Sequence, residues 1–136
     1  FRPDHSAYES LYKTLTDVGF VLTIHAEPDE KNSSPYYIEK VAMKFPVLRI
    51  MLGHLSPDAL TVMERTKNLW ADTSLTSFKT VKMAFEMGVG DRICFGSDYP
   101  YANGPEFEIW KVKKALPNQS DQELVFHRNL ERFLHH

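Results

Sequence analysis

The sequence has little cysteine, no long hydrophobic run and no excess of either charge, and each absence excludes a class of protein. The single cysteine, Cys94, cannot form an intrachain disulfide. No run of about 18 apolar residues that would span a bilayer occurs. With 16 Lys and Arg against 18 Asp and Glu, the net charge of −2 gives no electrostatic reason to expect nucleic acid or an anionic membrane as partner. We therefore expect a cytoplasmic protein with neither kind of partner.

The composition that remains is that of a folded globular chain. Hydrophobic residues make up 43% of the sequence and aromatic residues 12%, and a chain of 136 residues favours one domain over two. The chain starts at Phe1 without a methionine. We expect residues 1–136 to form a single domain that continues from an upstream segment.

Apolar runs alternate with helical periodicity along the whole chain. Short runs rich in aliphatic and aromatic residues are predicted strands at residues 20–24, 47–52, 68–72 and 92–96. Segments with apolar residues three and four apart are predicted helices at residues 6–18, 36–45, 57–67, 78–87, 107–116 and 121–134. Strands that alternate with helices at this spacing pair in parallel, so the predicted fold class is α/β, with strands buried on both faces.

Polar side chains follow three of the predicted strands directly. His25 comes after the first strand, His54 after the second and Asp98 after the fourth. In parallel α/β folds the carboxyl ends of the strands meet at one edge, where sites are built. Each residue alone has a structural explanation, a hydrogen bond for either histidine or a helix N-cap for Asp98. The three together predict a site, and imidazole and carboxylate donors suit Zn²⁺ or a similar divalent ion.

Five stretches of the sequence resemble the later motifs of amidohydrolase-related (β/α)₈ barrels. They are Thr23-Ile24-His25-Ala26-Glu27, Leu52-Gly53-His54-Leu55, Leu69-Trp70-Ala71-Asp72-Thr73-Ser74, Cys94-Phe95-Gly96-Ser97-Asp98-Tyr99-Pro100 and Arg128-Asn129-Leu130. Residues 96–100 are the most specific of these. The resemblance implies that the strands are the fifth to eighth of a TIM-type barrel, and that the chain is the C-terminal part of a longer metal-dependent hydrolase.

The resemblance also implies a role for each site residue. His25 is expected to bind the metal from the fifth strand. Asp98 is expected to bind it from the eighth and to accept a proton from metal-bound water. His54, on the sixth, is expected to be catalytic in a one-metal site and a metal ligand in a two-metal site. The His-x-His pair that family members carry on their first strand does not occur in this sequence. One ion, zinc, is favoured over two, with no organic cofactor and with weak affinity for this piece alone.

The expected function follows from these roles. The first hypothesis is a hydrolase that uses a metal-activated water to cleave a C–N, C–O or lactone bond of a small molecule. Two alternatives stay open: a nonoxidative decarboxylase of the same family, resembling aminocarboxymuconate-semialdehyde decarboxylase, and a catalytically silent half-barrel that serves as an interaction module. A barrel needs about 250 residues, so both edge strands would lack partners and we expect homo-oligomers.

Other polar residues are assigned structural roles. Asp72, Thr73 and Ser74 end the third strand, where an N-cap for the next helix is favoured over a place in the pocket. Glu27 is placed in a loop on the substrate side. Cys94 lies inside the fourth strand and is expected to be a buried, unreactive side chain.

Overall fold

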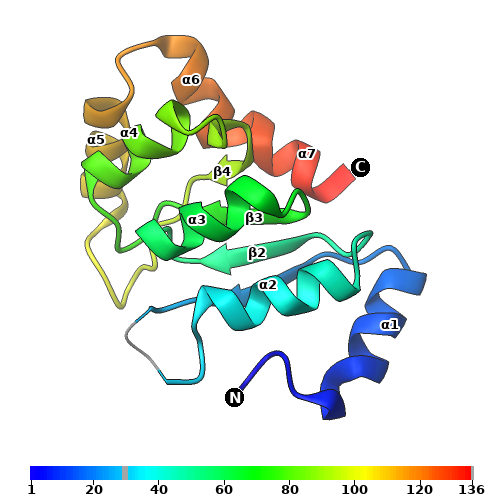
Figure 1. Cartoon of the computed structure of the whole chain (residues 1–136). Helices are drawn as coiled ribbons and strands as arrows, with labels where there is room; N and C mark the ends of the chain where they lie inside the picture. Colours follow the sequence, from blue (N-terminus) through cyan, green and yellow to red (C-terminus); the bar gives the residue numbers. More distant parts are fainter. Residues whose placement is uncertain (29–30, 136) are drawn as a thin grey trace.

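A parallel sheet of four strands forms the centre of the molecule in the computed structural model, which describes residues 1–28 and 31–135 (Figure 1). The strands are β1 (Leu22–His25), β2 (Ile50–Gly53), β3 (Leu69–Asp72) and β4 (Ile93–Cys94), paired in the order β1-β2-β3-β4. Each neighbouring pair is parallel, with Leu22 opposite Ile50 and Asp72 opposite Cys94 in the register. The predicted parallel α/β fold is therefore confirmed.

In the part of the chain that the structure describes, one α-helix precedes the first strand, one fills each connection between strands, and three follow the last strand. The α-helices are α1 (Glu9–Asp17), α2 (Pro35–Lys44), α3 (Pro57–Arg65), α4 (Phe78–Glu86), α5 (Pro105–Ala115), α6 (Gln119–Glu123) and α7 (Asn129–His135). Short 3₁₀ turns lie at η1 (Ser6–Tyr8) and η2 (Gly90–Arg92), and a π-helical turn, η3 (Leu124–Arg128), joins α6 to α7 in place of the single closing helix expected there. Within the described ranges, no helix is both long and apolar enough to cross a membrane.

Local sequence signals set several of these helix ends. The hydroxyl oxygen of Ser56 accepts the backbone N–H of Ala59 at the start of α3, where Pro57 occupies the first turn. Gly88 follows α4 with φ of 73°, a left-handed conformation that glycine adopts without strain. The helix start predicted at residue 57 and the helix end predicted at residue 87 are therefore met to within one residue, whereas the helix predicted to start at residue 121 begins at Gln119, after Asn118.

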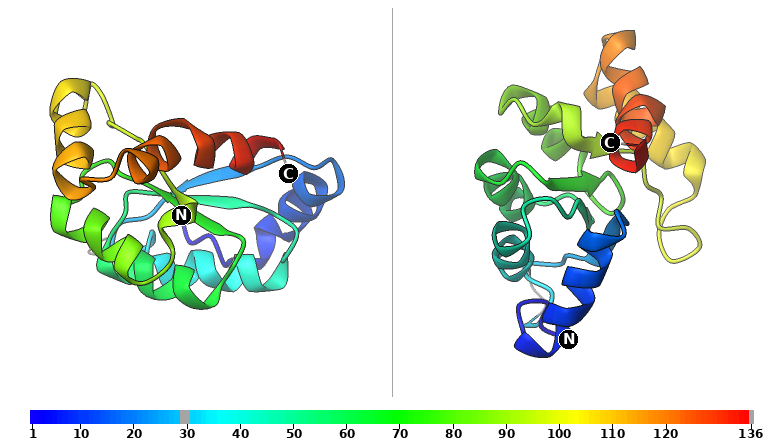
Figure 2. Two further views of the ribbon diagram at one scale, coloured as in Figure 1. Left: turned by 90° about the horizontal axis from the view of Figure 1, so that it is seen from above. Right: turned by 90° about the vertical axis from the view of Figure 1, so that its right-hand side faces the viewer.

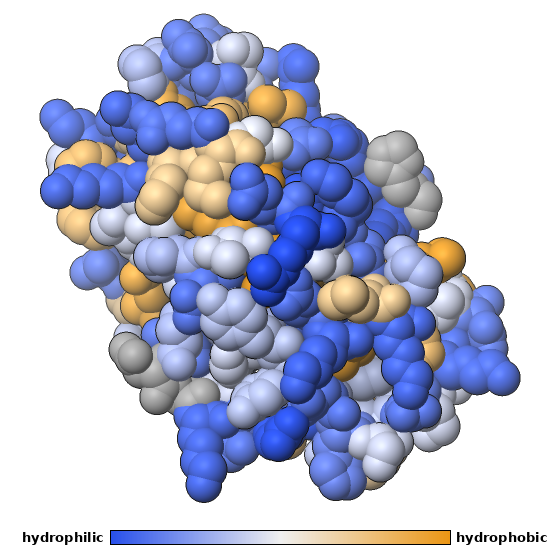
Figure 3. All heavy atoms as spheres, viewed as in Figure 1, coloured by the Kyte–Doolittle hydropathy of each residue, from blue (hydrophilic) through white to orange (hydrophobic). Residues whose placement is uncertain are grey.

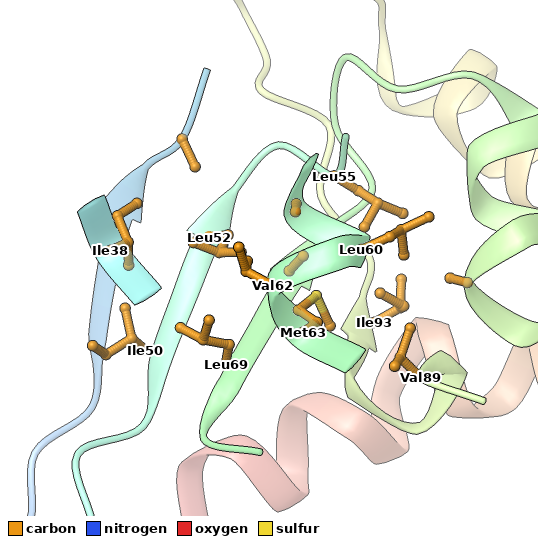
Figure 4. Packing of buried hydrophobic residues seen from close by; sticks show 14 of the residues in the cluster. Ile38, Ile50, Leu52, Leu55, Leu60, Val62, Met63, Leu69, Val89 and Ile93 are labelled. Carbon is orange, nitrogen blue, oxygen red and sulfur yellow. The ribbon is translucent and has the colours of Figure 1, made fainter. Parts of the chain in front are cut away.

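Two helices cover one face of the sheet and form most of the core with it. Figure 2 shows α2 and α3 on one side of the strands and α7 on the other. Aliphatic side chains of β2 and β3 interlock there with Ile38 of α2 and Leu60 of α3 (Figure 4). The surface of this helical layer, in front in Figure 3, is mostly hydrophilic, with apolar residues gathered in a few patches. One face of the sheet is thus sealed from solvent.

The opposite face of the sheet is covered only in part. Met51, Trp70 and Cys94 point to this side and pack on Phe133 of α7, with 5.5 Å between the ring centroids of Trp70 and Phe133. In a closed barrel this inner face would be the interior. Helix α7 covers it at one end only, and the carboxyl edge stays open.

The first strand is less buried than its sequence predicts. All four residues of β2 are buried, as expected, but Thr23 and His25 of β1 are exposed, and Phe20 just before the strand is 65% exposed. The prediction that each strand is buried on both faces is therefore wrong for β1. The reason is that β1 lies at the edge of the sheet and has a neighbouring strand on one side only.

The last strand is shorter than predicted, and its outer edge is not open. Regular pairing stops at Cys94, and the next backbone N–H, that of Phe95, donates to the carbonyl of Val125 at 2.8 Å. The side-chain amide of Asn129 donates to the carbonyls of Gly90 and Ile93 on the same side. The η3–α7 segment therefore takes the position beside β4 where another strand was missing.

A buried arginine satisfies the carbonyls at the end of α3 and the start of β3. The Arg92 guanidinium is 6% exposed and donates to the carbonyls of Met63, Thr66 and Leu69 at 2.8 to 3.0 Å. Burial lowers the pKa of Arg92. Buried carbonyls need a hydrogen-bond donor from the protein. The guanidinium supplies it and thereby links η2 to the end of α3 and the start of β3.

Replacing this arginine should destabilise the fold. Arg92→Met leaves buried carbonyls without donors and should lower the free energy of unfolding by about 2–4 kcal/mol, measured by urea denaturation. Arg128→Met is the matched control, because Arg128 is an exposed partner of Glu123 and exposed pairs contribute about 0–1 kcal/mol. Equal losses in the two variants would contradict this assignment.

Candidate active site

A cavity of about 390 Å³ opens at the carboxyl ends of the strands, on the inner face of the sheet. All four strands and the segments after them contribute to its wall, because alternate residues of each strand face this side. Its lining residues are Thr23, His25, Met51, Gly53, His54, Asp72, Ser74, Cys94, Phe95, Gly96, Asp98 and Leu130. The three residues predicted from the sequence, His25, His54 and Asp98, therefore line one cavity.

The two histidines lie against each other. Residue His25 ends β1 opposite Gly53, so His54 follows one position beyond the paired register. The ring centroids of His25 and His54 are 5.0 Å apart, with an angle of 83° between the ring planes. His25 is exposed and His54 is 9% exposed. Adjacent parallel strands thus bring both imidazoles to one point, with His54 the more enclosed.

The third predicted residue lies in a tight turn after β4. Asp98 has a φ of 53°, and its carbonyl accepts the backbone N–H groups of Tyr101 at 2.8 Å and Ala102 at 3.1 Å. The next helix, α5, has Gly104 as its N-cap. The alternative explanation of Asp98 as the N-cap of the next helix is therefore excluded, and Asp98 lines the cavity.

The donor types at this edge fit a divalent metal ion, whereas the number of converging donors is small. Imidazole nitrogen and carboxylate oxygen are the ligands that zinc and similar ions take in proteins. Across residues 1–28 and 31–135, no group of three or more His, Cys, Asp or Glu side chains lies close enough together to hold an ion. His25 and Asp98 would therefore hold such an ion only together with further ligands that the described residues do not supply.

A second set of polar residues, which sequence reasoning did not place in the site, adjoins His54. Asp72 and Ser74 were expected to cap the next helix, but α4 is capped by Ser77, whose hydroxyl oxygen accepts the N–H of Thr80 at 3.1 Å. Ser74 instead lies with its hydroxyl oxygen 2.7 Å from Nδ1 of His54. The N-cap interpretation is wrong. The available signal was the Asp-x-Ser spacing at a strand end, which puts both side chains on the inner face.

Asp72 connects this group to the backbone of His54. Its Oδ1 accepts the backbone N–H of Ser74 at 2.8 Å and the Ser74 hydroxyl, and its Oδ2 accepts the backbone N–H of His54 at 3.3 Å. The carbonyl of Asp72 also accepts the N–H of Leu55 at 2.9 Å. These bonds hold His54 at φ of 81°, a left-handed conformation that costs a non-glycine residue about 1–2 kcal/mol.

Neighbouring segments hold the Asp72–Ser74 strap in place from two sides. Lys111 of α5 is buried, pairs with Glu108 and donates from Nζ to the carbonyl of Thr73 at 2.7 Å. The Thr73 hydroxyl exchanges bonds with the backbone of Gly96 at 3.2 and 3.3 Å. The strap is therefore anchored to both α5 and the segment after β4.

The remaining polar residues behave mostly as the sequence predicts. Cys94 is buried, and burial, with a further contribution from Asp72, raises its thiol pKa to about 12, so it is a packed and not a nucleophilic side chain. Glu27 lines a second cavity of about 280 Å³, to which His54 also contributes. His5 caps η1 by accepting the N–H of Ala7.

Comparison with known proteins gives one family and several solved barrels. The sequence model of the family described as amidohydrolase matches residues 1–135. No curated protein matches the chain. An uncharacterized TIM-barrel protein from Bordetella bronchiseptica is 26% identical with a TM-score of 0.80, over 98% of this chain and 52% of that one.

Two aromatic acid decarboxylases share the fold at lower identity. The 5-carboxyvanillate decarboxylase of Sphingomonas paucimobilis is 16% identical with a TM-score of 0.78, over 98% of this chain and 55% of that one. The dihydroxybenzoic acid decarboxylase of Polaromonas sp. JS666, described with bound manganese and 2-nitroresorcinol, is 14% identical with a TM-score of 0.76, over the same 98% and 55%. The chain spans about half the length of these structures.

The close approach of Gly96 to the strap can be tested by adding one methyl group. A Cβ at position 96 would lie 2.6 Å from Oδ1 of Asp72, so Gly96→Ala must push Asp72 away from Ser74 and His54. We expect a loss of about 1–3 kcal/mol in the free energy of unfolding, measured by urea denaturation. Gly104→Ala is the control, because its Cβ would meet only the carboxylate end of exposed Glu106. If Gly96→Ala is as stable as Gly104→Ala, the packing described is incorrect.

Proposed function

The chain belongs to the amidohydrolase family, and from that premise we propose that it supplies half of a barrel enzyme that needs a divalent metal to act on a small molecule. The observation that carries this proposal is the placement of His25, His54 and Asp98 around one cavity at the carboxyl edge. Because the chain belongs to this family, a shared catalytic site explains why the three residues line one cavity. Separate structural hydrogen bonds would not explain it. A reducing, cytoplasmic location is part of the proposal.

The proposed roles follow from the donor atoms and from burial. His25 and Asp98 would hold one ion, zinc or manganese, together with ligands from the other half of the barrel. A bound ion supplies positive charge that polarises a substrate oxygen or lowers the pKa of water. His54, more enclosed than His25, transfers a proton at Nε2 to or from the substrate, and the Asp98 carboxylate accepts a proton at the other side of the cavity.

Two reactions are compatible with these roles. Nonoxidative decarboxylation of an aromatic acid is the first candidate, favoured by the decarboxylases among the structures that share the fold. In that reaction His54 takes up a proton from solvent at Nε2 and delivers it to the ring carbon from which the carboxyl group departs as CO₂. Hydrolysis of a C–N, C–O or lactone bond is the second, favoured by the position of Asp98 as a base for water. Release of CO₂ from dihydroxybenzoates, against hydrolysis of simple amides and lactones, distinguishes them.

We further propose that residues 1–136 form one domain that makes up the later half of the barrel. The sheet contains four strands, and the chain spans 52 to 55% of the compared structures. On the outer side of β1 lies a largely apolar cavity of about 290 Å³ between the strand and the residues of η1 and α1. In the whole protein this edge would pair with the preceding strand of the barrel.

The metal assignment predicts different losses for the three residues in the full-length protein. His25→Ala and Asp98→Ala should both lose the metal, measured by elemental analysis after gel filtration. His54→Ala should keep most of the metal while kcat falls by about 10²–10⁴, the contribution of a general acid–base group. His5→Ala is the control, because His5 is the N-cap of η1 and does not line the cavity. Loss of metal in His54→Ala equal to that in His25→Ala would make His54 a ligand, and unchanged metal in all three variants would reject the proposal.

The half-barrel assignment predicts association of the isolated chain. Strand β1 is the end strand of the sheet and pairs with β2 on one side only, so its outer edge should pair with a second copy. Sedimentation at rising concentration should therefore show homo-oligomers. Thr23→Pro removes a backbone N–H at this edge and should shift the chain toward monomer. A monomer at all concentrations would contradict this part of the proposal, and a folded, associating chain whose full-length form has no metal and no turnover would support the interaction-module alternative.

A further inference from the structure

The positions of the protons in the His54–Ser74–Asp72 group follow from simple counting. A serine hydroxyl has one proton, and Asp72 Oδ1 already accepts the backbone N–H of Ser74 at 2.8 Å. A carboxylate oxygen can only accept, so the hydroxyl of Ser74 donates to it. The side of the hydroxyl oxygen that faces His54 therefore carries a lone pair.

This arrangement determines which nitrogen of His54 carries the proton. Nδ1 lies 2.7 Å from the Ser74 oxygen. Two lone pairs at that distance would repel each other, so Nδ1 must donate. In a neutral imidazole the proton on Nδ1 leaves Nε2 with the lone pair. The network therefore selects one of the two neutral tautomers of His54.

The network is enclosed and rigid enough to maintain that choice. Ser74 is 2% exposed and His54 is 9% exposed, so water has little access to compete for Nδ1. The strap that carries Ser74 is fixed by Lys111 on one side and by Gly96 on the other. Groups held in place by packing and hydrogen bonds need no rearrangement when a proton moves.

We infer that Ser74 and Asp72 are positioning residues that keep His54 in the Nδ1–H tautomer and orient its ring, so that Nε2 is the proton-transferring atom. Both residues line the cavity, and the role inferred for them is exerted through their hydrogen bonds to His54. The inference rests on the proposed function only in giving Nε2 a reaction to perform, because the tautomer itself is a property of the chain's own hydrogen bonds.

Nitrogen NMR of histidine-labelled full-length protein, loaded with diamagnetic Zn²⁺, tests the tautomer directly. The His54 signals are assigned by their loss in His54→Gln. We expect a protonated Nδ1 and an unprotonated Nε2 in the wild type and in Ser74→Thr, which keeps the hydroxyl. In Ser74→Ala the proton should shift toward Nε2. Ser77→Ala, which removes a nearby hydroxyl that caps α4, should leave the tautomer unchanged.

Kinetics of the same variants separate positioning from folding. Ser74→Ala should lower kcat about 10- to 100-fold with little change in KM, the size of effect seen when a supporting partner of a site residue is removed. Ser74→Thr should restore most of the activity, and Ser77→Ala should keep it.

A wild-type His54 that carries its proton on Nε2 overturns the inference, as does a Ser74→Ala variant with the wild-type tautomer. The tautomer could shift in Ser74→Ala while the full-length protein shows no metal-dependent turnover and His25→Ala leaves the metal content unchanged. That result supports the inference and rejects the proposed function. The two failures are therefore distinguishable, because one is read from nitrogen shifts and the other from metal content.

Discussion

Parallel pairing of four consecutive strands is the constraint on which the rest of this structure depends. Since every strand runs in the same direction, the residues that follow each strand meet at one edge. Residues that are dozens of positions apart in the sequence therefore lie next to each other, as the rings of His25 and His54 do. The same constraint puts Asp72 and Asp98 on the wall of the same cavity.

The two faces of the sheet serve different purposes. The outer face is aliphatic and packs against α2 and α3, which gives the strands a fixed support. The inner face carries Thr23, His25 and Asp72 beside apolar Met51 and Cys94, so polar groups are concentrated toward the carboxyl edge. Because the outer face provides most of the packing, the inner face can hold polar residues at the carboxyl edge without loss of the core.

Buried polar side chains fix the ends of short strands that have few backbone bonds of their own. Buried Arg92 and half-buried Asn68 each bond three carbonyls, and buried Lys111 bonds the carbonyl of Thr73 at the end of β3. Such groups cannot exchange a protein partner for water without loss, so each joins segments distant in sequence. These hydrogen bonds also fix the geometry of the cavity. Lys111 does so most directly, because it holds the Asp72–Ser74 strap that bonds His54.

The sequence by itself determined the order and type of the elements and the identity of His25, His54 and Asp98 as strand-end residues, because local apolar periodicity reports which segments pack and where they stop. The sequence could not predict that β1 is only partly buried, since an apolar run does not show which of its faces another element covers. The bonds of Ser74 and Asp72 to His54 were also decided by the tertiary structure alone. They depend on the register between β2 and β3 and on a lysine in α5, 38 residues beyond Thr73, and no local pattern encodes a contact of that kind.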